Sequence, residues 1–343
     1  MTLIDTLFDT MREHIEKNEM RRKYEEAYEV SIDIDAFTSY LSKRVKGCVD
    51  ESVSISRDRL EAAVRALRYA RNLVHFPMSP KRTSESTMNL MMDIAQPYVR
   101  VHESFNLLDD ALLLAMSGRY TPAFSVLRTS IESIVAGVFY HCLCVPGFRK
   151  RAKALLFNTR RTDRVSVGQI LDELLTNNPE LAANGLVLER ALETKFQEYT
   201  PPVLPPGFNT MLKSTLEHYD FPGGLDAYDY IYNTLYGPLS AYTHVMSDAT
   251  TLWQKELDDE LVFDSGLVNV RMLDMFIGIF FKVLDSIGAL FVTAARTWYN
   301  DPGTLSSIVA QDSTIHQHGT ELTLTNEALD KVLGLKRLRA KSD

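Results

Sequence analysis

Two charged residues interrupt an otherwise apolar stretch, and they are the first candidates for chemistry. Residues 123–144 read AFSVLRTSIESIVAGVFYHCLC, a pattern that predicts a helix buried on every side. Arg128 and Glu132 lie four residues apart, so their Cβ atoms would be about 6 Å apart on one helix face. A buried charge needs a partner. Either the two charges are neutralised, by each other or by residues of another helix, or they line a polar cavity inside a helical bundle.

A second polar stripe follows about a hundred residues later, in YGPLSAYTHVMSD. Tyr236, Ser240 and His244 are spaced at i, i+4 and i+8, so they would share one helix face across a Gly-Pro break. A histidine on such a stripe is either a hydrogen-bonded core residue or a group that exchanges a proton near neutral pH. Because every buried polar group needs a partner, these residues and the Arg128–Glu132 pair could satisfy one another across a bundle core.

The elements that would position these residues are helices. Residues 57–76 form a strongly amphipathic pattern that ends at Pro77, and residues 88–145 predict a helical hairpin that turns at Gly118. The apolar stretch 267–299 carries its charges at helical spacing, which predicts a long amphipathic helix. Strand signals are rare, with a weak one at ELTLT near residue 321. The predicted fold is all-α, a helical bundle with an N-terminal helical extension. The predicted segments are an extension at 1–87, a bundle core at 88–303 and a C-terminal tail at 304–343.

Composition narrows the class of protein. The chain has 343 residues, is 45% hydrophobic and 24% charged, and carries a formal net charge of -8, which argues against a surface coated for nucleic acid. Three cysteines do not make a disulfide framework and fit a reducing cytoplasm. A membrane-spanning helix needs about 20 nearly uncharged residues, and neither of the apolar stretches 123–144 and 267–299 meets this requirement. We therefore predict a cytoplasmic protein without membrane spans.

The two polar motifs carry a resemblance. The pair LRTSIESI (127–134) and LSAYTH (239–244) resembles an uncharacterised all-helical bacterial and archaeal family close to the HEPN superfamily. The resemblance covers roughly residues 90–300. It implies a helical nucleic-acid-associated domain, and many HEPN proteins are metal-independent ribonucleases of defence and toxin systems. Their R-x(4–6)-H motif is often completed across a dimer, so the resemblance also implies a homodimer.

This chain departs from the HEPN motif. Its nearest local match is ARNLVHF, where only three residues separate Arg71 from His75. Arg71 and His75 would share a helix face and form an alternative site. The other interpretation of this pair is the exposed end of an amphipathic helix just before Pro77.

If the protein cleaves RNA, its candidate residues have the types that the reaction needs. Cleavage of RNA needs a base for the 2′-hydroxyl proton and a cation for the charge on the phosphorane. His244 would be the base or acid, and Arg128 would clamp the phosphate by paired contacts. Glu132 would orient one of them, and Ser240 or Tyr236 would hydrogen-bond the scissile group.

A basic run follows the apolar helix and could steer RNA by phosphate contacts, although a solvated helix surface is the alternative. Its members are Arg149, Lys150, Arg151, Lys153, Arg160, Arg161 and Arg164. No phosphate-binding glycine loop, no dinucleotide fingerprint and no zinc pair is present, so we predict no metal and no cofactor. Two hypotheses remain. One is a HEPN-like protein that binds or cleaves RNA, and the other is a non-catalytic interaction module, with a homodimer or a protein partner, whose polar core is structural.

Overall fold

The fold is all-α, as predicted, and a computed structural model describes its helices. It describes residues 34–75, 95–144, 148–149, 166–199, 204–218, 221, 226–243, 254–257, 260–263, 268–294 and 322–333. Within these ranges the strands are β1 (Gln254–Leu257) and β2 (Glu260–Phe263), which pair as an antiparallel hairpin. All other described elements are helical.

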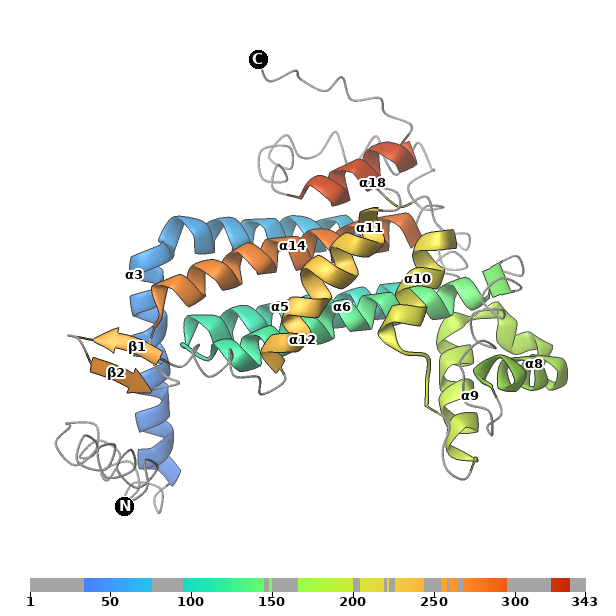
Figure 1. Cartoon of the computed structure of the whole chain (residues 1–343), viewed down its shortest axis with the longest axis horizontal. Coiled ribbons are helices and arrows are strands. Elements are labelled where there is room, and N and C mark those ends of the chain that lie inside the picture. The colour runs from blue at the N-terminus through green and yellow to red at the C-terminus, as the bar shows by residue number, and fades with distance from the viewer. Residues whose placement is uncertain are drawn as a thin grey trace, which may run out of the picture.

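The centre of the molecule is the predicted helical hairpin. Its arms are α5 (Ala95–Met116) and α6 (Tyr120–Leu143), which pack along each other (Figure 1). The turn between them needs Gly118, whose φ of 75° lies in the left-handed region that favours glycine. Most of α6 is buried, because α5, α9, α10, α12 and α14 all contact it.

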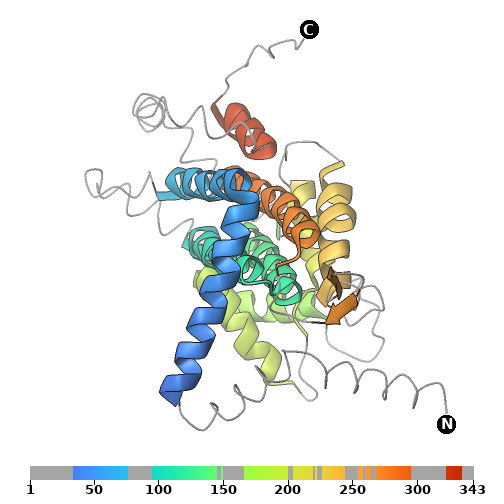
Figure 2. The same cartoon turned by 90° about the vertical axis from the view of Figure 1, so that its left-hand side faces the viewer.

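Two long helices close the bundle on one side. α14 (Val270–Ala294) contacts α5 and α6, and α3 (Ile34–His75) contacts α14 and α5. α3 is bent at Ser56, whose φ of −127° and ψ of 31° are not helical. Figure 2 shows the first part of α3 running away from the bundle and the second part lying beside α14. The second part of α3 is the amphipathic helix predicted at 57–76, which begins directly after the bend.

The strand predicted at ELTLT is wrong, because this segment opens α18 (Thr323–Leu333), which packs on α14. Leu322, Thr325 and Leu329 are buried at spacings of three and four residues, which is a helical period. Buried residues of α18 and α3 belong to the same hydrophobic core as those of α5, α6 and α14. The segment boundaries at 87 and 303 stay predictions.

Shorter helices form the end of the bundle that carries the C-terminal part of α6. They are α8 (Val167–Asn177), η3 (Pro179–Ala183), α9 (Gly185–Gln197) and α10 (Phe208–His218). Ser166 and Gln169 form a capping box at the start of α8, which satisfies two backbone donors of its first turn. The 3₁₀ turn η3 then connects α8 to α9.

The predicted helix break at Gly237-Pro238 is wrong. α11 (Asp226–Asp229), the π-helix η4 (Tyr230–Tyr236) and α12 (Gly237–Thr243) follow one another without interruption. The N–H of Gly237 donates to the carbonyl of Tyr232, five residues back, which is a π-helical hydrogen bond. Because Pro238 has no N–H and would crowd an α-helical turn, the wider π turn before it lets the helix continue.

By length and composition alone, α6 and α14 could each cross a membrane. Within the described residues, however, 67% and 72% of their most apolar windows are buried inside the protein. The core helix of a bundle passes the same test, so these two helices are weak grounds for a membrane span. The cytoplasmic location stays a prediction.

Candidate functional site

One lane of α6 is open, and it carries the two charges. Ser125, Arg128, Glu132 and Ala136 are half-buried at helical spacing and form this lane, and Thr129 beside it is exposed, while most of the rest of α6 is buried. The side chains of Arg128 and Glu132 are 24% and 32% exposed. The prediction of a helix buried on every side is therefore wrong at this lane, because the neighbouring helices leave it partly uncovered.

Arg128, Glu132 and Tyr236 form a mutually hydrogen-bonded triad between α6 and η4. The Nε of Arg128 donates to Oε1 of Glu132 at 3.0 Å, and a terminal nitrogen of the same guanidinium donates to the hydroxyl of Tyr236 at 3.0 Å. The Tyr236 hydroxyl in turn donates to Oε1 of Glu132 at 2.8 Å. The guanidinium carbon also lies 5.1 Å from the centre of the Tyr236 ring, within cation–π range. The structure thus brings together three of the predicted site residues.

Their surroundings raise the pKa values of both Arg128 and Tyr236. Burial of the guanidinium acts to lower the pKa of Arg128, but the Glu132 carboxylate and the Tyr236 hydroxyl outweigh it and hold the pKa above its ordinary value. Burial, followed by the hydrogen bond to Glu132, raises the pKa of Tyr236. Arg128 is therefore a cation at neutral pH, paired with the Glu132 side chain and flanked by a neutral phenol.

The other two members of the predicted stripe lie further along the chain. Ser240 is half-buried on α12, four residues after Tyr236. His244 lies outside the described residues, directly after the end of α12 at Thr243. Its predicted role as base or acid stays a prediction.

Parallel aromatic rings extend the site away from Arg128. Tyr228, Tyr232 and Tyr236 stack in sequence, with ring centres 5.4 Å and 5.8 Å apart and planes inclined by 11° and 17°. Phe208 of α10 stacks on Tyr236 at 4.0 Å and 15°. We call these four residues the aromatic ladder. Its three tyrosines are half-buried and Phe208 is buried.

The alternative site predicted around Arg71 is used for packing. Arg71 donates to the backbone carbonyl of Phe105 at 3.0 Å and forms an ion pair with Asp109, both on α5. The side chain of His75 lies outside the described residues. The contacts of Arg71 connect α3 to α5. This structural role accounts for an arginine at this position without a catalytic role.

The basic run after α6 is described only at its start. Phe148 is buried and makes an edge contact with the ring of Phe139 at 6.0 Å, and the half-buried Arg149 follows it. The remaining predicted phosphate contacts, which fall on 150–164, lie outside the described residues. These are Lys150, Arg151, Lys153, Arg160, Arg161 and Arg164.

Sequence reasoning missed a second polar cluster, between α5, α6 and α9. Glu189 of α9 is buried, with a side chain only 5% exposed, and accepts from Arg100 at 2.7 Å and from Gln96. Arg100 also donates to Glu103 at 2.8 Å, and the Ser133 hydroxyl donates to the same Glu103 oxygen at 2.6 Å. Burial raises the pKa of Glu189, against the opposing attraction of Arg100. This cluster fixes the packing of three helices.

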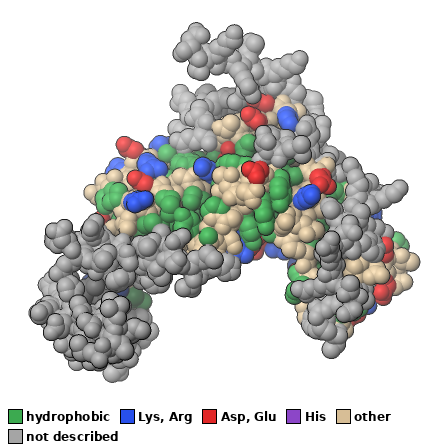
Figure 3. Space-filling model, in the orientation of Figure 1, with side chains coloured by type: hydrophobic (Ala, Val, Ile, Leu, Met, Phe, Trp, Pro, Cys, Tyr) green, Lys and Arg blue, Asp and Glu red, His purple; other side chains and the backbone are tan. Residues whose placement is uncertain are grey.

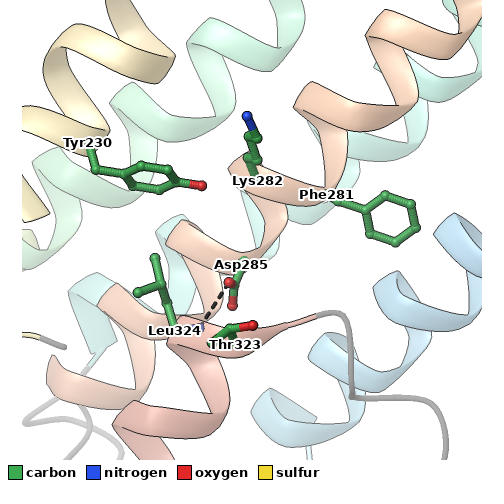
Figure 4. Close-up of a pocket in the computed structure, with 6 residues that line it drawn as sticks. All are labelled: Tyr230, Phe281, Lys282, Asp285, Thr323 and Leu324. Carbon is green, nitrogen blue, oxygen red and sulfur yellow. Dashed lines mark hydrogen bonds between the residues drawn. The ribbon is translucent and has the colours of Figure 1, made fainter. Parts of the chain in front are cut away.

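A third polar feature was also missed, at the start of α18. Both carboxylate oxygens of Asp285 on α14 accept backbone N–H groups, from Leu324 at 2.9 Å and from Thr325 at 2.8 Å. The same carboxylate borders an open pocket of about 340 Å³, into which Tyr230 of η4 and Lys282 of α14 also project (Figure 4). Asp285 therefore caps the first turn of α18, although Asp285 and Thr325 are 40 residues apart in the sequence.

The aromatic ladder and the cluster around Glu189 were not predicted, although each had a signal in the sequence. Tyr228 and Tyr232 continue the stripe of Tyr236 backwards at intervals of four residues. Glu189 lies on the apolar stripe that includes Leu188 and Leu192 of α9. A charge at a core position of an amphipathic helix predicts a buried partner. The identity of that partner, Arg100, has no local signal.

Among the residues that the structure describes, no group of three or more His, Cys, Asp or Glu side chains could hold a metal ion. Comparison with family models, with curated proteins and with solved structures finds no match to this chain. The chemistry of the site is therefore the basis for any proposal about function.

Proposed function

We propose that this protein binds RNA along the open lane of α6, with Arg128 as the phosphate contact. The observation that carries the proposal is the partly exposed Arg128 side chain, which is held in place at one end of a row of stacked aromatic rings. Glu132 and Tyr236 hold the guanidinium in place, and a fixed guanidinium can bind phosphate oxygens in pairs. The role in a defence or stress system and the homodimer are proposed on the resemblance to the HEPN superfamily alone.

Replacing Arg128 with alanine is expected to weaken RNA binding about 10- to 150-fold, because one charge-assisted hydrogen bond contributes about 1.5–3 kcal/mol. The plot of log affinity against log salt concentration should also become shallower, by about 0.7 for each phosphate that the variant no longer neutralises. Fluorescence anisotropy with a labelled 12-nucleotide RNA at several salt concentrations measures both quantities.

The matched control for this variant is Arg59→Ala. Arg59 also pairs with a carboxylate, Asp274, but does so on the seam between α3 and α14. We expect its affinity and salt dependence to equal those of the wild type. An unchanged salt dependence in a folded Arg128→Ala protein would contradict the proposal, because a purely structural arginine leaves the number of neutralised phosphates unaltered.

We also propose that the bound RNA is cleaved without a metal ion. His244 would take the 2′-hydroxyl proton, and the 2′-oxygen would attack the adjacent phosphorus to give a 2′,3′-cyclic phosphate. The 5′-oxygen of the next nucleotide would leave as its bond to that phosphorus breaks, taking a proton from water. Arg128 would stabilise the charge on the phosphorane. Incubating RNA with wild type and His244→Ala, in the presence of EDTA, tests this step. Cleavage lost in a folded mutant supports it, and no cleavage by the wild type contradicts it while leaving binding intact.

One observation favours a second candidate, a non-catalytic interaction module. Arg128, Glu132 and Tyr236 satisfy one another, as a purely structural tie between α6 and η4 would do. For that function, Arg128→Ala should lower the melting temperature strongly, and the wild type should bind no RNA. The anisotropy titration of the folded wild type therefore separates the two candidates.

A further inference from the structure

The aromatic ladder has the geometry of a stacking surface. Its four rings are nearly parallel, and the centre-to-centre distances between successive tyrosines, 5.4 Å and 5.8 Å, are those of offset stacking. In offset stacking each ring covers only part of the next one. Part of each tyrosine face is therefore left for another flat ring to contact.

The ladder is packed against α10 and is only partly buried. Phe208 is buried and backs the ladder through its stacking on Tyr236, while the hydroxyl of Tyr228 is held by Asn209 at 2.7 Å. Tyr228 and Tyr232 are half-buried, so each is partly open to solvent. Figure 3 shows hydrophobic side chains, the colour that includes tyrosine, gathered between isolated charges on the face where α11 and α12 lie in Figure 1.

The ladder also ends at a cation. Arg128 lies over the Tyr236 ring, so a ligand that stacks on the ladder would reach a phosphate-binding group at that end. Flat rings joined to a phosphate backbone are the chemistry of unpaired nucleotides, and base stacking on aromatic side chains is tolerant of base identity. In a duplex the faces of the bases are already covered by their neighbours.

We propose that the aromatic ladder binds the unpaired bases of single-stranded RNA, and that this site therefore selects single strands over duplexes. The inference rests on the proposed function, because Arg128 supplies the phosphate contact beside the ladder. Stacking specifies the class of RNA without reading its sequence.

The test uses the full chain and three probes of equal length: a single-stranded 12-mer, the same 12-mer as a duplex, and an abasic strand with the same phosphates. Tyr232→Leu should weaken binding of the single strand about 5- to 150-fold, the range given by about 1–3 kcal/mol per stacked base. Tyr232→Phe, which keeps the ring, should bind as the wild type does. Affinity for the abasic strand should be low in the wild type and unchanged by either substitution.

The outcomes separate the inference from the proposed function. Equal binding of the single strand and the abasic strand by the wild type overturns the ladder but leaves phosphate binding through Arg128 standing. Equal loss of affinity in folded Tyr232→Leu and Tyr232→Phe also overturns it, because the phenylalanine retains the stacking ring. Absence of binding to all three probes overturns both. Tyr228→Leu provides a second variant in case Tyr232→Leu fails to fold.

Discussion

Replacing Arg100 with methionine is expected to lower the free energy of unfolding by about 3–5 kcal/mol, because it leaves a buried carboxylate without its cation. Glu189 is only 5% exposed at its side chain and is held by Arg100 and Gln96. Methionine keeps an unbranched stem against Gly137, where an added Cβ would come within 2.6 Å of the Arg100 stem. The decrease therefore reports on the charge and not on the packing. Urea unfolding followed by circular dichroism measures it.

The decrease in the free energy of unfolding that Arg100→Met causes should be smaller at lower pH. The pKa of Glu189 is already raised by burial, and removal of Arg100 takes away the main force that opposes the rise. A raised folded-state pKa contributes stability that is fully present below the unfolded value of about 4.3 and is lost as pH rises through the folded pKa. We therefore expect the deficit of the variant to shrink as pH falls from 8 towards 5.

Two controls test the assignment of this effect to the ion pair. Arg59→Met removes an exposed partner of Asp274 and should cost at most about 1 kcal/mol. The double variant Arg100→Met/Glu189→Met should be more stable than Arg100→Met alone, because no buried charge is then left unpaired. A double variant as unstable as the sum of the two single changes would show that the cluster does not act as a pair.

Replacing Asp285 with alanine is expected to destabilise the docking of α18 by about 2–4 kcal/mol, since two backbone N–H groups would lose their acceptor. These are the N–H groups of Leu324 and Thr325, and the Thr325 hydroxyl also donates to the backbone carbonyl of Asp285. Gly288 allows this approach, because an added Cβ there would lie 2.5 Å from the Thr325 hydroxyl oxygen. Hydrogen exchange of the α18 amides measures the change.

The matched control is Asp274→Ala, an aspartate on the same helix whose side chain is 44% exposed. It should leave exchange in α18 unchanged and cost at most about 1 kcal/mol overall. Exchange in α18 that is equally slow in Asp285→Ala and in the wild type would contradict the proposed cap. Faster exchange in both variants would point to a general loss of stability of α14.

Local patterns predict much of this molecule. The four-residue interval between Arg128 and Glu132 predicts their ion pair, and the stripe through Tyr236 predicts that a polar group on a later helix would meet them. Helical periodicity likewise predicts the α5–α6 hairpin and its turn at Gly118. In each case the information lies within a few residues of the chain.

The other contacts between distant segments have no such signal. Arg100 and Glu189 are 89 residues apart, and Asp285 is 40 residues from Thr325, whose N–H it accepts. The segment that opens α18 alternates like a strand, yet it forms a helix because α14 offers a cap and an apolar surface. The continuity through Pro238 depends on a π turn, which local propensity does not predict.

Photocrosslinking of bound RNA would test the RNA-binding site most directly. A single-stranded RNA that carries 4-thiouridine would be irradiated with the full chain, digested with trypsin and analysed by mass spectrometry. We predict adducts in the tryptic peptide 214–255, at Tyr228, Tyr232 or Tyr236. Adducts confined to other peptides, or no adduct with a folded protein, would contradict the claim that this site binds RNA.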